Sequence, residues 1–207
     1  MKDLDQIRMI TVNFSTLQGL KMVPLGLLLT VVSLWANSGT GPRRDILFPG
    51  ACVVAGFFLY YLISRYYARV FGTVQPTVAM RRNEIIRGVL GGILGLAAFL
   101  ADVTYKLPVS FIGLALGLAP LGEHLWLSRQ SRVRVEPVII SVTVLITILS
   151  LLPLAGVNWW QPLGIRSRLV GVCVITGIIF VALGIWEHTR LVKLLPPPEE
   201  ANHEQRV

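Results

Sequence analysis

The sequence predicts an all-α polytopic membrane protein: a bundle of six transmembrane helices with both termini on the cytoplasmic side and an interfacial amphipathic helix at the N-terminus. Three observations predict this fold class. Of the 207 residues, 54% are apolar and only 14% are charged, which is too apolar for an ordinary soluble domain. Six apolar runs are separated by short polar segments, and the basic residues fall unequally on the two sides of those runs.

The six candidate spans are residues 20–36, 46–63, 88–105, 107–127, 138–154 and 169–186. Each has about the 17 to 25 residues that a helix needs to cross a hydrocarbon core of about 30 Å. We expect helices because lipid cannot hydrogen-bond an exposed backbone. Very little chain connects the third and fourth spans, so we expect a tight helical hairpin there, with a single long buried or re-entrant unit as the alternative.

The basic residues give the orientation. Of the 19 Lys and Arg residues, fourteen fall on one side of the six spans and five on the other. The five are Arg43, Arg44, Lys106, Arg166 and Arg168. Because Lys and Arg concentrate on the cytoplasmic side of membrane proteins, both termini are predicted to be cytoplasmic, in a bacterial-type inner membrane.

The two ends of the chain differ from the spans. Between residues 3 and 18, apolar residues recur at steps of three and four among charged ones, which is typical of a helix lying in the membrane interface. Three consecutive prolines, Pro196 to Pro198, end the last helix. We therefore expect a single transmembrane domain over residues 1–195 and a disordered cytoplasmic tail over residues 196–207.

Glycines at four-residue spacing predict close helix packing in the third and fourth spans. Such spacing lets two helix backbones approach closely in lipid. An alternative is that these glycines line a substrate path. The residues concerned are Gly88, Gly91, Gly92, Gly95, Gly113 and Gly117.

Two Glu-His pairs are the main candidates for chemistry, because ionisable groups at membrane depth are costly. Glu123 and His124 end the fourth span, and Glu187 and His188 end the sixth. If the two helices touch, these groups could bind a divalent metal or relay protons. Adjacent residues on a helix point about 100° apart, however, so we favour interfacial polar residues that pair with nearby arginines. No residue is predicted to be catalytic and no metal site is predicted.

A tyrosine-rich extension of the second span is the most distinctive local segment. Arg65 and Arg69 lie one helical turn apart, with Tyr66 and Tyr67 between them. These residues are candidates for docking an anion or a protein partner, since Arg binds phosphate and carboxylate groups well. The simpler interpretation is a helix that leaves the membrane through an aromatic belt, with arginines that reach the headgroups.

Charge and motifs narrow the function only broadly. The net charge of +8 is concentrated beside apolar runs, which favours attraction to anionic membrane lipids over binding of nucleic acid. The sequence contains no Walker A loop, no GxSxG motif and no cysteine zinc pattern. We expect no cofactor.

The general plan resembles that of the permease subunits of ATP-driven transporters, or of the small six-helix substrate-capture subunits of vitamin transporters. The resemblance implies a non-catalytic membrane subunit associated with transport, with a cytoplasmic ATPase or a sister membrane subunit as its partner. One alternative is a membrane enzyme that acts on a lipid or prenyl substrate at the cytoplasmic interface. A purely structural subunit of a larger complex is another.

Overall fold

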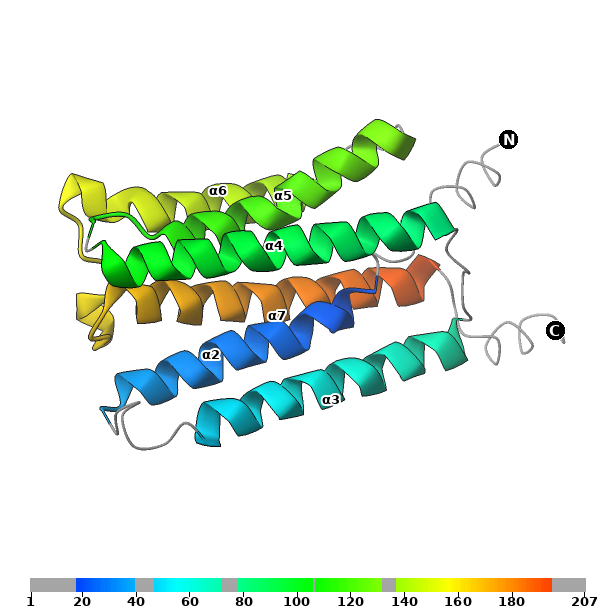
Figure 1. Ribbon diagram of the computed structural model, residues 1–207, viewed down its shortest axis with the longest axis horizontal. Coiled ribbons are helices and arrows are strands. Elements are labelled where there is room, and N and C mark those ends of the chain that lie inside the picture. Colours follow the sequence, from blue (N-terminus) through cyan, green and yellow to red (C-terminus); the bar gives the residue numbers. More distant parts are fainter. Residues whose placement is uncertain (1–17, 40–46, 72–77, 106, 132–136, 195–207) are drawn as a thin grey trace, which may run out of the picture. The chain divides into compact units, whose positions relative to one another are not determined.

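The described part of the protein consists of helices joined by short irregular segments, and it contains no strands. The computed structural model describes residues 18–39, 47–71, 78–105, 107–131 and 137–194. Its elements, in chain order, are the 3₁₀ helix η1 (Gly19–Met22), α2 (Val23–Asn37), α3 (Leu47–Val70), α4 (Val78–Thr104), α5 (Phe111–Ser131), α6 (Pro137–Leu151), the 3₁₀ helices η2 (Leu152–Ala155) and η3 (Gln161–Leu163), and α7 (Arg168–Leu194). Figure 1 shows these helices. The predicted all-α class is confirmed for these residues, while the predicted interfacial helix and C-terminal tail lie outside them.

Four helical segments are long and apolar enough to cross a membrane, judged by length and composition. They are Gly19–Asn37, Leu47–Val70, Pro137–Ala155 and Arg168–Lys193. The apolar parts of the other two long helices are shorter, Gly88–Thr104 and Phe111–Gly122, because the first turns of α4 and the last turns of α5 carry charged residues. Six spans therefore stay a prediction.

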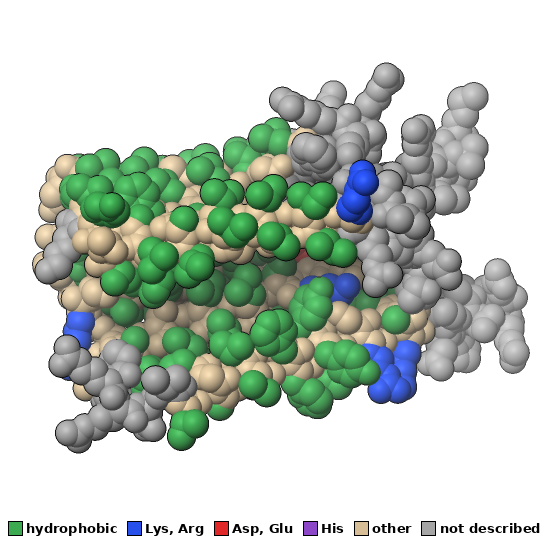
Figure 2. Space-filling view, in the orientation of Figure 1, with side chains coloured by type: hydrophobic (Ala, Val, Ile, Leu, Met, Phe, Trp, Pro, Cys, Tyr) green, Lys and Arg blue, Asp and Glu red, His purple; other side chains and the backbone are tan. Residues whose placement is uncertain are grey.

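Hydrophobic side chains cover the outside of the helices. On α3, Val54 and Phe57 are 69% and 72% exposed, and on α4 exposed aliphatic side chains run from Ile85 to Val103. Figure 2 shows hydrophobic side chains over much of the visible face and Lys and Arg side chains toward the helix ends. Apolar surface of this extent is unfavourable in water, so these helices are compatible with a protein embedded in a membrane.

The chain divides into two compact units, which are described separately. Unit 1 contains residues 1–32, 42–75 and 177–207, and unit 2 contains residues 33–41 and 76–176. Helices α2 and α7 each contribute residues to both units. The predicted single transmembrane domain stays a prediction.

In unit 1, two glycine pairs bring the segment formed by η1 and α2 against α7. A Cβ atom at Gly19 would lie 2.6 Å from the Gly184 carbonyl oxygen, and one at Gly26 would lie 2.6 Å from the Gly177 oxygen. Gly19 and Gly26 are seven residues apart, as are Gly177 and Gly184, which is about two helical turns. Because the first glycine of one segment contacts the last of the other, the two segments run antiparallel. Only glycine permits this approach of two antiparallel segments. The predicted four-residue spacing did not identify these glycines.

In unit 2, α4, α5 and α6 pack together, with α5 in contact with both of the others. Helix α4 ends at Thr104 and α5 begins at Phe111, so the third and fourth predicted spans are two separate helices. A hairpin that spans the membrane stays a prediction, with the re-entrant unit as its alternative. The close glycine contacts of α5 are made with α6 and α7, where Gly113 meets Ser150 and Val172 and Gly117 meets Ile146.

The glycines of α4 behave differently. At Gly88, Gly91, Gly92 and Gly95 an added Cβ atom would meet nothing within 4 Å in unit 2. Gly88, Gly91 and Gly92 are exposed and Gly95 is partly exposed, and none of the four forms the contact between α4 and α5. Their predicted role in close packing stays a prediction.

Candidate functional site

Polar side chains gather in two places, one in each unit. We name them the Tyr67–His188 cluster, in unit 1, and the Asp102 cap, in unit 2. A third feature, an apolar groove, lies between α2 and α3 of unit 1.

The Tyr67–His188 cluster forms at the C-terminal ends of α3 and α7. Tyr67 is only 1% exposed and packs against the fully buried Leu191, with Leu20, Ile63 and Phe71 around them. The polar tip of a buried tyrosine needs a hydrogen-bond partner. Its hydroxyl lies 3.0 Å from His188 Nδ1, and the Leu20 backbone N–H donates to it at 3.3 Å.

The Tyr67 hydroxyl and the two tyrosine rings hold the His188 side chain in place. The hydroxyl accepts from the Leu20 N–H and forms a second hydrogen bond with His188 Nδ1, in which the histidine tautomer decides which group donates. The ring of His188 also lies edge-on to Tyr66 and Tyr67, at centroid distances of 6.0 and 5.7 Å. Tyr67 therefore fixes the position of the His188 ring.

A buried glutamate, Glu187, lies next to His188 in the chain. Glu187 is only 3% exposed, because the glycine contact at Gly19 brings the backbone of η1 directly over it. A histidine hydrogen-bonded to a phenol, beside a buried glutamate, can hold a proton or pass one on.

The two sequence-based candidates in unit 1 therefore meet. Arg65 and Arg69 are exposed on α3 and Tyr66 is half-exposed, as a docking surface requires, whereas Tyr67 is buried and belongs to the cluster with His188. Sequence reasoning treated the tyrosines and the Glu-His pair as separate candidates. No local signal joins Tyr67 to His188, because 121 residues separate them.

The other Glu-His pair, Glu123 and His124, lies on α5 in unit 2. Its side chains are outside the described residues, so neither the favoured pairing of Glu123 and His124 with arginines nor the alternative, a convergence of the two Glu-His pairs, is tested. Among the side chains that the structure describes, no group of three His, Cys, Asp or Glu residues could hold a metal ion.

The Asp102 cap fixes the start of α5. The Asp102 carboxylate accepts hydrogen bonds from the backbone N–H groups of Phe111 and Ile112, at 2.8 and 3.0 Å, and from the Ser110 hydroxyl at 3.0 Å. A carboxylate in this position satisfies N–H groups that the helix itself leaves without partners, and it complements the helix dipole.

Arg168, at the start of α7, completes the cap. Its guanidinium lies 3.8 Å from the carboxylate of Asp102, whose side chain is only 1% exposed, and also donates to the Leu107 carbonyl. The described partners of Asp102 lie at the start of α5 and on α7.

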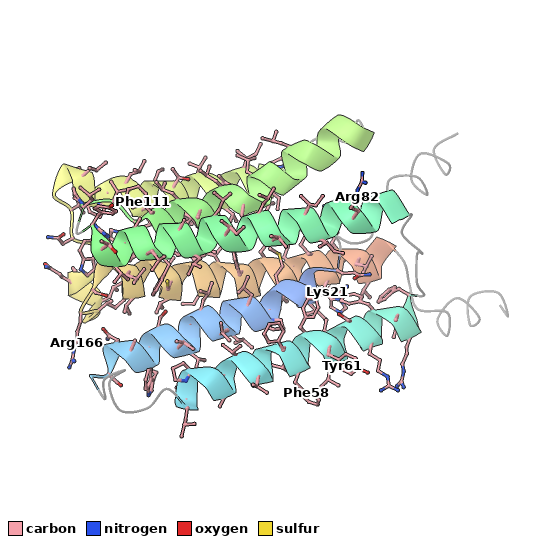
Figure 3. The ribbon with its side chains drawn as sticks, viewed as in Figure 1. Lys21, Phe58, Tyr61, Arg82, Phe111 and Arg166 are labelled. Atoms are coloured by element: carbon pink, nitrogen blue, oxygen red, sulfur yellow. The ribbon has the colours of Figure 1, made fainter. Side chains whose placement is uncertain are left out.

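The groove between α2 and α3 is nearly all apolar. It has a volume of about 340 Å³ and is lined by Lys21, Pro24, Leu25, Leu28, Val53, Gly56, Phe57 and Tyr60. Lys21 is the only charged residue among them, and its Nζ lies 5.8 Å from the centre of the Tyr60 ring. Figure 3 shows Lys21 where the chain enters α2, and Phe58 on the side of α3 that points away from α2.

No known protein family, characterised protein or solved structure matches this chain.

Proposed function

We propose that this protein is an integral inner-membrane protein with six spans and both termini in the cytoplasm, acting as a non-catalytic membrane subunit associated with transport, either permease-like or accessory. Three findings support this proposal: four long apolar helices, a largely apolar outer surface, and the unequal division of basic residues.

The observation that carries the non-catalytic role is that polar side chains within the apolar helices are hydrogen-bonded or paired with other parts of the chain. Asp102 caps α5 and pairs with Arg168, and His188 is hydrogen-bonded to the buried Tyr67. Both groups connect segments distant in sequence. Buried polar groups with such partners are typical of a scaffold that fixes helix positions.

The exposed C-terminal end of α3 supports the proposal that the protein binds a partner subunit. Arg65 and Arg69 lie one turn apart and are exposed, with Tyr66 between them. Arg and Tyr are enriched at protein interfaces. A cytoplasmic ATPase or a sister membrane subunit that carries an acidic surface would complement this end of the helix.

The test is purification of the tagged chain from its native host in mild detergent. We expect an ATPase or a sister subunit to co-purify, and we expect R65A/R69A to reduce its yield several-fold. R166A is the matched control, because Arg166 is also exposed but lies at the predicted outer side. A chain that purifies alone contradicts the proposal, and partners without an ATPase or transport subunit favour the purely structural role.

A second candidate is an enzyme that acts on a lipid or prenyl substrate at the cytoplasmic interface. The observation that favours it is the hydrogen bond between Tyr67 and His188 beside the buried Glu187, since these groups could move a proton during a reaction. Substitutions H188A and E187A decide between the two roles. Loss of cellular function with an unchanged set of co-purifying partners favours the enzyme, whereas unchanged function in both variants excludes it.

A further inference from the structure

The groove between α2 and α3 has the form of a site for a lipid chain. Its walls come from Leu25 and Leu28 on one side and Val53 and Phe57 on the other. Its volume of about 340 Å³ lies at the lower end of the roughly 300–1,000 Å³ common for ligand sites. Apolar walls of this kind bind hydrocarbon without directional contacts.

Polarity is confined to one end of the groove. Lys21 and Tyr60 lie together there, and the seven-residue step from Lys21 to Leu28 corresponds to roughly 10 Å along a helix. Beyond Tyr60, the exposed Arg65 and Arg69 continue α3 at the same end. A ligand that fits this pattern has an anionic group at one end and an apolar chain at the other.

A glycine keeps the groove open. At Gly56 an added Cβ atom would reach the Leu28 side chain across the groove at 3.4 Å, the near limit of ordinary van der Waals contact. A larger side chain at this position would fill the space between the helices. Gly50, on the same helix, is exposed, and a Cβ atom there would meet nothing within 4 Å.

We propose that this groove binds an anionic phospholipid of the surrounding bilayer, with one acyl chain between α2 and α3 and the headgroup phosphate near Lys21. The commitment to an anionic lipid rests on charge complementarity. Among the described residues that line the groove, Lys21 is the only charged one, and a cation near the membrane surface favours anionic headgroups. The site requires only that the chain lies in a bilayer, so it does not depend on the proposed transport role.

The experiment is native mass spectrometry of the full-length protein in detergent, titrated with dioleoyl phosphatidylglycerol, dioleoyl phosphatidylcholine or oleate. The wild type is expected to bind the anionic phospholipid roughly five-fold more tightly than the zwitterionic one, the ratio expected for one basic residue at the surface. K21Q should remove this preference while binding of phosphatidylcholine persists. G56L should weaken binding of both phospholipids, whereas G50L, the same change outside the groove, should not.

Several results would overturn the proposal. They are equal binding of the two phospholipids by the wild type, an unchanged preference in K21Q, or equal binding by G56L and G50L. Oleate that binds more tightly than phosphatidylglycerol would assign the groove to free fatty acids instead. Circular dichroism and gel filtration show whether each variant folds. If G56L does not fold, K21Q still decides the test, because Lys21 is partly exposed and its replacement leaves the packing in place.

Discussion

Replacing Asp102 with alanine tests the polar contacts of the Asp102 cap. The substitution removes the acceptor of two backbone N–H groups and of the Ser110 hydroxyl, and it removes the carboxylate beside Arg168. Loss of a helix cap costs about 0.5–2 kcal/mol, and loss of one member of a buried ion pair costs about 3–5 kcal/mol. These losses overlap at one carboxylate, so we expect the free energy of unfolding to fall by about 3–5 kcal/mol.

The assay is reversible unfolding in mixed micelles, followed by circular dichroism as sodium dodecyl sulfate is added. The matched control is S167A, because the Ser167 hydroxyl also caps a helix, accepting from the Val170 N–H at 3.3 Å, but is exposed. Loss of that exposed cap should cost only about 1 kcal/mol. D102N should lie between the two, because its amide retains one acceptor oxygen and no charge.

A double-mutant cycle with R168M isolates the ion pair. If Asp102 and Arg168 interact as their 3.8 Å separation indicates, D102A should cost less in the R168M background, by about 0.5–3 kcal/mol. The reasoning is refuted if D102A destabilises the protein no more than S167A does, or if the costs of the two substitutions simply add.

The remaining predictions concern packing, the Tyr67–His188 cluster and topology. G113A should destabilise the protein by about 1–3 kcal/mol, because its Cβ atom would lie 2.6 Å from Val172. The control G91A should be neutral or stabilising, because a Cβ atom there meets nothing within 4 Å. Equal effects of the two substitutions in the same unfolding assay would contradict the packing described. Y67F should cost about 0.5–1.5 kcal/mol through loss of the hydroxyl that connects η1 to α7, and Y66F should cost less than half as much. In a chain without its native cysteines, a cysteine at position 158 should react with a membrane-impermeant maleimide added to intact cells. Tags at both termini should stay protected from added protease. A terminus that the protease cleaves would refute the proposed orientation.

The apolar runs predicted where helices lie because that information is local. A run of apolar residues bounded by charges specifies a membrane helix without reference to the rest of the chain. The observed helices extend beyond the predicted spans where charged residues follow or precede the apolar run. Helix α3 continues to Val70 and α4 begins at Val78, since charged residues end an apolar run but do not end a helix.

The glycines show a different limit. A four-residue spacing identifies a face on which close approach is possible, and Gly113 and Gly117 do lie at such contacts. Whether a given face meets a neighbour depends on how the helices are arranged, so Gly88 and Gly91 carry the same signal without a contact in unit 2.

The sequence by itself determined the helical class, the approximate extent of the helices and an outer surface suited to lipid, because each depends on residues near one another in the chain. Only the tertiary structure decided that Tyr67 is buried against α7 rather than exposed for docking, and that Asp102 caps α5 and pairs with Arg168. The physical reason is that a buried polar group needs partners, and those partners come from distant segments that only the packing of helices brings together.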